Sequence, residues 1–176
     1  MSLQDDLRAV IRQEASRLHT PEGMDPAQLL AALADVESSF GLHAVPNHEP
    51  AYDEGGRYYA SAQHVRDLHK TWGAWAACSY GPWQLLYVLA WEVGFRGTPG
   101  DLWTPEGSIE WAIRALNARA LDKGAATVED VGDAWNSGSF RDANRVEDYR
   151  RKIAVAYARE DLLDPFGIKG SGTGGG

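Results

Sequence analysis

Apolar side chains recur at helical spacing between residues 25 and 40, where they occupy Leu29, Leu30, Leu33, Val36 and Phe40. Side chains three and four residues apart share one face of an α-helix, so the pattern predicts a helix with one face in the core. Asp25 is a suitable N-cap, and Pro26 fits the first helical position because that position needs no backbone N–H donor. The segment therefore predicts a helix that begins directly after Asp25.

Glu37 lies on the apolar face of this helix, one turn beyond Leu33 and beside Val36. An ionised carboxylate would be poorly hydrated there, and burial of that kind raises the pKa of a carboxyl group. A glutamic acid that stays protonated near neutral pH can act as a general acid. The spacing alone leaves a second interpretation open, in which Glu37 is a structural residue paired with an arginine.

Most of the remaining chain also shows the apolar spacing of helices, and no repeat or convincing strand pairing is present. The predicted helices cover residues 3–18, 63–70, 85–93, 105–120 and 143–160, and another opens at Thr127 and ends near Trp135. These segments predict an all-α, mainly helical fold with room for a small β-hairpin between residues 41 and 61. We expect residues 1–168 to form one domain with a single core and the glycine-rich residues 169–176 to form a disordered tail.

The segment 41–61 interrupts the helical pattern with glycines and prolines, and aromatic and charged residues alternate irregularly through it. A long aromatic-rich segment of this kind is more typical of a binding loop than of a linker. Glu49 stands in this segment, directly before a proline. We expect it either to orient water or substrate across a cleft or to be an ordinary solvated glutamate, whereas Asp53 and Glu54 should be solvated.

Composition excludes several classes of function. The 176 residues carry a net charge of −8, which argues against a nucleic-acid backbone or an anionic bilayer as the main partner. The sequence contains neither an apolar run of about 18 residues nor a secretory signal. We therefore expect that the protein is made in the cytoplasm and does not insert into a membrane. Cys78 is the single cysteine and should be a buried, inert thiol. His64 and His69 are five residues apart, which does not suit one helix face, so we expect no metal site and treat both as isolated surface histidines.

Three short motifs follow one another along the chain. Val36-Glu37-Ser38-Ser39-Phe40 ends the first predicted helix, Ser79-Tyr80-Gly81-Pro82-Trp83-Gln84 opens a second, and Ala134-Trp135-Asn136-Ser137-Gly138 ends a third, with Tyr149 downstream. Together they resemble the lysozyme-like lytic transglycosylases, which include soluble lytic transglycosylases and share a superfamily with goose-type lysozymes. The likeness spans residues 25–157. The segment around His48, Glu49 and Pro50 is similar to the phage and mobile-element branch of that family.

The resemblance implies that Glu37 is the catalytic acid, that the turn from Gly81 to Gln84 lines a sugar-binding cleft, and that Asn136 and Tyr149 shape the site. The candidate substrate-binding residues are Ser38, Glu49, Tyr80, Gly81, Gln84, Trp135, Asn136 and Tyr149. Three departures from the family pattern put substrate contacts in question: Trp135 replaces the usual tyrosine, Pro82-Trp83 replaces leucine-methionine, and Pro46 stands where the commoner pattern has a serine. Trp83 could equally pack in the core or stack on a sugar ring.

These observations lead us to expect a peptidoglycan lytic transglycosylase. Glu37 would protonate the oxygen of the MurNAc-β-1,4-GlcNAc bond and then, as a carboxylate, accept the proton of the muramyl 6-hydroxyl as a 1,6-anhydro ring closes. A hydrolytic muramidase and a catalytically inactive glycan-binding phage-tail module are the alternatives. We expect a monomer without cofactors whose partners are peptidoglycan glycan strands. It would act on the cell wall or in the periplasm as a phage endolysin or a virion-associated enzyme.

Overall fold

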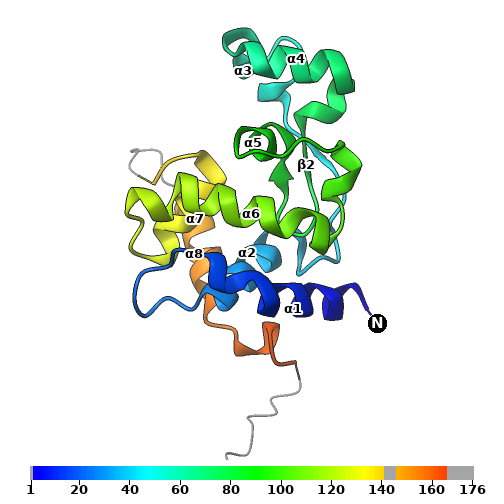
Figure 1. Cartoon of the computed structure of the whole chain (residues 1–176). Coiled ribbons are helices and arrows are strands. Elements are labelled where there is room, and N and C mark those ends of the chain that lie inside the picture. Colours follow the sequence, from blue (N-terminus) through cyan, green and yellow to red (C-terminus); the bar gives the residue numbers. More distant parts are fainter. Residues whose placement is uncertain (1, 141–145, 166–176) are drawn as a thin grey trace, which may run out of the picture.

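The computed structural model describes residues 2–140 and 146–165, and the predicted mainly helical fold is confirmed. A larger hydrophobic core is built by five helices, which lie together in the middle and lower part of Figure 1. These helices are α1 (Leu3–Glu14), α2 (Pro26–Ser38), α6 (Pro105–Arg119), α7 (Val128–Ser137) and α8 (Glu147–Tyr157). The predicted tail, residues 169–176, lies outside the described residues.

The helix α2 begins as its sequence predicts. The side chain of Asp25 accepts hydrogen bonds from the backbone N–H groups of Ala27 and Gln28, at 2.8 and 3.0 Å, and Pro26 follows as the first helical residue. The helix ends at Ser39, whose left-handed backbone (φ 52°) forms the C-cap. Its apolar face is fully buried from Leu29 to Ala34, so Glu37 is carried on a well-anchored element.

A second, smaller core belongs to the other end of the molecule, although the sequence suggested a single core. It is formed mainly by α4 (Gln63–Trp72), by α5 (Tyr87–Glu92) and by the strands β2 (Cys78–Tyr80) and β3 (Leu85–Leu86). The short helix α3 (Arg57–Ser61) precedes α4, and both lie farthest from α1 in Figure 1. Trp135 packs against both cores, so the two clusters meet at this side chain.

Short 3-10 helices connect these elements. They are η1 (Ala15–Arg17), η2 (Pro50–Tyr52), η3 (Gly73–Ala77), η4 (Pro99–Leu102), η5 (Leu121–Lys123) and η6 (Glu160–Leu162).

The small sheet has the order β1-β2-β3, and both pairings are antiparallel. The strand β1 (Asn47–His48) pairs with β2, so that Asn47 lies opposite Ser79. Only one strand therefore falls between residues 41 and 61, and its partner comes from a segment 30 residues further along the chain. The local hairpin that the turn residues suggested is replaced by this pairing, which binds the predicted loop to the second core.

Cys78 lies in β2 and is buried, and its thiol donates to the backbone carbonyl of Ala74 at 3.4 Å. Among the described residues no helix combines the length and the apolar character that crossing a membrane requires.

Candidate active site

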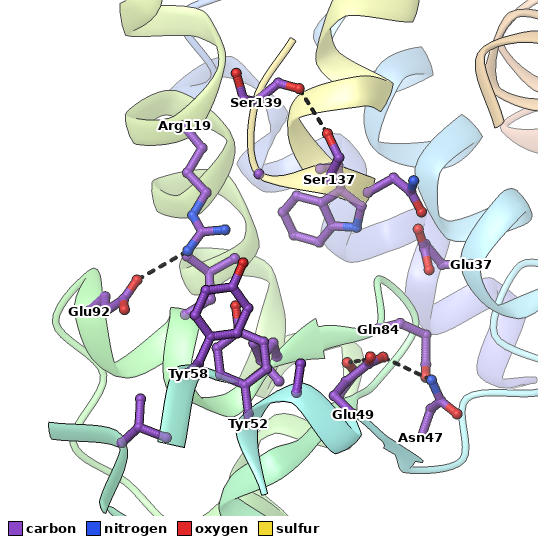
Figure 2. Close-up of a pocket in the computed structure, with 18 of the residues that line it drawn as sticks. Glu37, Asn47, Glu49, Tyr52, Tyr58, Gln84, Glu92, Arg119, Ser137 and Ser139 are labelled. Atoms are coloured by element: carbon purple, nitrogen blue, oxygen red, sulfur yellow. Dashed lines mark hydrogen bonds and ion pairs between the residues drawn. The ribbon is translucent and has the colours of Figure 1, made fainter. Parts of the chain in front are cut away.

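A cleft of about 1260 Å³ runs between the two cores. Pockets for drug-sized ligands usually enclose about 300–1,000 Å³. This cleft is larger, so it has room for a ligand bigger than a typical drug-sized molecule. Its walls come from the end of α2, the 43–58 segment, the starts of α4 and β3, the end of α5 and the ends of α6 and α7. Figure 2 shows the side chains that line it.

Glu37 enters this cleft from the last turn of α2 (Figure 2). Burial raises the pKa of its carboxyl group from 4.5 to about 7, a hydrogen bond from Tyr149 opposes that rise, and the negative charge of Glu49 adds to it. The Tyr149 hydroxyl donates to Oε1 of Glu37 at 2.5 Å. No arginine or lysine pairs with Glu37 among the described residues, so the interpretation of a structural ion pair finds no partner. Glu37 is therefore substantially protonated near pH 7 and open to the cleft.

Tyr149 binds the Glu37 carboxyl group from the side of the larger core. It lies on α8 and packs on the larger core, outside the residues that line the cleft. A Cβ added at Gly132 on α7 would lie 2.8 Å from a methyl carbon of Ile153 and 3.3 Å from the Tyr149 ring, so the glycine lets α7 and α8 approach closely. Burial and the charge of Glu37 both raise the pKa of the Tyr149 phenol, which therefore remains a hydrogen-bond donor. The predicted substrate contact by Tyr149 becomes a positioning contact in the structure.

Glu49 lies at the end of β1 and lines the cleft together with Glu37. The pairing of β1 with β2 fixes its backbone, because its N–H donates to the carbonyl of Ala77 at 2.7 Å. Asn47 donates its side-chain amide to Oε1 of Glu49 at 3.0 Å, which orients the carboxylate. Figure 2 shows Glu37 and Glu49 entering the pocket from different elements. The structure thus favours the interpretation of Glu49 as a cleft residue over that of a freely solvated loop residue.

Ser38 is buried, and its hydroxyl connects α2 to the turn between β2 and β3. It donates to the carbonyls of Ala34 and Pro82, at 3.0 and 2.7 Å, and accepts from the N–H of Gly41 at 2.9 Å. The single O–H proton is shared between these two carbonyls and one lone pair accepts from Gly41, so protein groups hold the buried hydroxyl. The predicted substrate-binding residue Ser38 is not among the residues that line the cleft, and its hydroxyl connects the turn to α2.

Gly81 and Tyr80 are also buried and lie outside the residues that line the cleft. Gly81 has φ +71°, and a Cβ there would lie 2.4 Å from the carbonyl oxygen of Leu102, which leaves room only for glycine. Tyr80 is fully buried in the second core and donates its hydroxyl to the carbonyl of Trp75 at 2.6 Å. Neither of these predicted substrate-binding residues lines the cleft, and the backbone of Gly81 packs against the end of η4.

Gln84 is the member of this turn that reaches the cleft. Its Nε2 donates to the carbonyls of Val45 and Gly81, each at 3.1 Å, so the amide nitrogen is held by protein groups and the oxygen remains available as an acceptor. Its backbone lies in the left-handed region (φ 45°), a conformation that costs about 1 kcal/mol or more for a residue with a side chain. This conformation brings the side chain to the base of the cleft beside Asn47 (Figure 2).

The motif at the end of α7 lines the cleft from Trp135 to Gly138. Trp135 and Asn136 both line the cleft, and Gly138 ends the helix with φ +84°. Trp135 is partly buried, so one part of its ring can face a ligand while the rest joins the two cores. Trp83, in contrast, is fully buried and donates its indole N–H to the carbonyl of Leu30 at 3.0 Å. Core packing is therefore the correct interpretation for Trp83.

The chain was compared with protein-family models, with curated proteins and with solved structures. No family model, no curated protein and no solved structure matches the chain.

The other end of the cleft contains residues that the sequence motifs did not identify. Glu92 at the end of α5 accepts from Nη2 of Arg119 at 3.1 Å and is 3.0 Å from Nε2 of His64. The rings of Tyr52 and Tyr58 stack beside them with centroids 4.4 Å apart (Figure 2). Both tyrosines fall in the predicted aromatic binding loop, whereas Glu92 and Arg119 end two ordinary helices and have no local signal. Only the packing of α5 against α6 brings that pair together.

The histidines lie within hydrogen-bonding distance of carboxylates, which corrects the expectation of isolated surface residues. Asp53 lies 2.6 Å from the ring nitrogens of both His48 and His69. A hydrogen bond from the backbone N–H of Glu54 lowers the pKa of Asp53, and the two histidines lower it further. Asp53 is therefore a link between β1 and α4, although the sequence suggested a solvated side chain. The described residues contain no group of three or more histidine, cysteine or carboxylate side chains with metal-binding geometry.

Proposed function

We propose that this protein cleaves the β-1,4 bond between MurNAc and GlcNAc in peptidoglycan, with Glu37 as the general acid. The observation that carries the proposal is a carboxyl group with a pKa of about 7 that opens into a long cleft and is held by Tyr149. Cleavage of a glycosidic bond needs a proton on the leaving oxygen, and a partly buried carboxylic acid supplies one at neutral pH. The identity of the glycan rests on the resemblance of the ordered motifs to lytic transglycosylases.

In the transglycosylase route, one carboxyl group performs both proton transfers. Glu37 protonates the leaving oxygen, and the acetamido group of the substrate stabilises the developing positive charge. The resulting carboxylate then accepts the proton of the muramyl 6-hydroxyl, whose oxygen bonds to the anomeric carbon. The products are a GlcNAc end and a 1,6-anhydro-muramyl end, and no water is consumed.

The position of Glu49 supports a second candidate, a hydrolytic muramidase. Hydrolysis by the inverting or the retaining route needs a second carboxylate, which activates water or forms a covalent intermediate. Glu49 shares the cleft, and its charge raises the pKa of Glu37, so the two carboxyl groups interact across the site. The two routes use the same acid and differ in the group that captures the anomeric carbon.

Mass spectrometry of digested peptidoglycan distinguishes the candidates. Purified walls are incubated with the wild-type protein and with Glu37→Gln, and solubilised muropeptides are collected. The transglycosylase route gives muramyl products lighter by one water than those of hydrolysis, and Glu49→Gln slows their formation without changing their mass. Reducing-end muramyl products that disappear in Glu49→Gln would instead establish the muramidase. An unchanged wall suspension with folded wild-type protein would contradict both and favour a glycan-binding module.

A further inference from the structure

The charges of the cleft are separated along its length. Glu37 and Glu49 lie toward one end, and Arg57, Arg119 and Lys123 belong to segments that line the other end. Figure 2 shows Arg119 and the two stacked tyrosines away from Glu37. The chain as a whole carries a net charge of −8, so a cluster of basic residues in this cleft runs against the general balance.

Two of these basic side chains retain hydrogen-bonding capacity. Arg119 uses Nη2 to bind Glu92, and its remaining N–H groups have no hydrogen-bond partner among the described residues. Arg57 makes no ion pair within the described part of the chain, and its guanidinium lies 4.6 Å from the centroid of the Tyr58 ring. A guanidinium presents several N–H donors in a planar arrangement that matches a carboxylate. The two side chains therefore offer donors to an anionic group in the cleft.

Glu92 offsets part of the positive charge at this end of the cleft and also fixes the position of Arg119. It is engaged by both Arg119 and His64, and α5 fixes its position. Its hydrogen bond from Nη2 orients the Arg119 guanidinium and restricts the rotamer of that arginine. The charge of Arg119 also reaches the phenol of Tyr52, where it opposes the rise in pKa that burial causes. Arg119 thus points toward the tyrosine platform, and its charge acts within the cleft.

We propose that this end of the cleft is a carboxylate-binding subsite for the peptide stem of peptidoglycan. The inference rests on the proposed glycan-cleaving function, because the stem is attached to the muramyl residue of the strand that Glu37 would cleave. The sugars would lie between Glu37 and Trp135, and a stem carboxylate would bind Arg119 and Arg57 while the stem backbone lies on Tyr52 and Tyr58. The protein then prefers peptide-substituted strands to bare glycan.

Steady-state cleavage of two matched substrates tests this inference. One substrate is un-cross-linked peptidoglycan strands with intact stems, and the other is the same strands after an amidase has removed the stems. We expect Arg119→Gln and Arg57→Gln each to lower kcat/KM on stem-bearing strands by about tenfold, mainly through KM, which is the range of one charge-assisted hydrogen bond. On bare strands each variant should stay within about twofold of the wild type.

Control variants distinguish the effect of losing a positive charge from the effect of losing the folded structure. Arg119→Lys keeps the positive charge and should recover part of the loss, and Arg151→Gln, an exposed arginine on α8 outside this cleft, should change neither substrate. Thermal unfolding of each variant reports whether it is folded, and Arg57→Gln, at an exposed position, supplies an answer even if Arg119→Gln fails to fold. A third substrate with amidated stem carboxylates should behave like bare strands.

The outcomes are distinguishable from failure of the proposed function. Equal kcat/KM on all three substrates for the wild type and both arginine variants would overturn the subsite and leave glycan cleavage intact. An equal loss on stem-bearing and bare strands would also overturn it, because the arginines would then serve the sugars or the fold. If the wild type cleaves neither substrate, the proposed function itself fails.

Discussion

The raised pKa of Glu37 makes the stability of the protein depend on pH in a way that one substitution can isolate. In the unfolded chain a glutamate titrates near 4.5, and in the folded protein Glu37 titrates near 7. The folded state therefore binds a proton more tightly than the unfolded state does. The stability that comes from this protonated group is fully present below pH 4.5 and is lost as the pH rises to 7.

The size of the effect follows from the same two values. Each unit of pKa difference corresponds to about 1.4 kcal/mol, so a difference from 4.5 to about 7 corresponds to about 3 kcal/mol. Glu37→Gln removes the titration but keeps an oxygen that accepts from Tyr149. Between pH 4 and pH 8 we expect the wild type to lose about 3 kcal/mol of unfolding free energy relative to Glu37→Gln.

Urea unfolding, followed by tryptophan fluorescence at several pH values, measures this difference. The comparison needs equal slopes with urea for the two proteins, because a changed slope indicates a change in the surface exposed on unfolding. Glu22→Gln, in an exposed loop, serves as the matched control and should follow the wild type. Parallel wild-type and Glu37→Gln stabilities over this pH range would refute the argument that burial raises the Glu37 pKa.

Four further outcomes follow from the same contacts. Glu37→Gln should lower wall cleavage by at least about a hundredfold in a turbidity assay while the protein stays folded, and full activity in the folded variant would rule out Glu37 as the acid. Wild-type activity should fall above about pH 7, as the Glu37 carboxyl ionises, and a flat profile from pH 5 to 9 would contradict this. Tyr149→Phe removes a hydrogen bond that lowers the Glu37 pKa, so the alkaline limb of the activity profile should move to higher pH; a shift to lower pH would show that Tyr149 acts otherwise. Ser38→Ala leaves the Pro82 carbonyl unpaired and should cost about 1–3 kcal/mol in urea unfolding with KM unchanged, whereas a raised KM at unchanged stability would restore Ser38 as a substrate contact.

The start of α2 and the burial of the Glu37 carboxyl group could be predicted from the local sequence pattern. Asp25 and Pro26 determine where α2 begins, because capping and the missing proline N–H are properties of a few adjacent residues. The helical period places Glu37 on an apolar face, and that alone predicts the direction of its pKa shift. The start of α6 and both ends of α7 were predictable for the same reason, since Thr104, Thr127 and Gly138 act within one helical turn.

Tertiary structure decided which motif residues face the cleft. The sequence grouped Ser38, Tyr80 and Gly81 with Gln84, but a motif does not show which side of a turn packs inward, and only Gln84 of these four reaches the cleft. Glu49 acquired its place through a strand pairing between distant segments, which local turn residues cannot specify.

The basic end of the cleft depends entirely on how helices pack. Glu92 and Arg119 are 27 residues apart, and nothing near either residue in the sequence indicates the other. Their ion pair and its tyrosine neighbours exist because two cores meet and leave a cleft between them. Periodicity along a chain specifies which face of an element is buried, whereas the composition of a cleft between two cores depends on contacts that the fold alone creates.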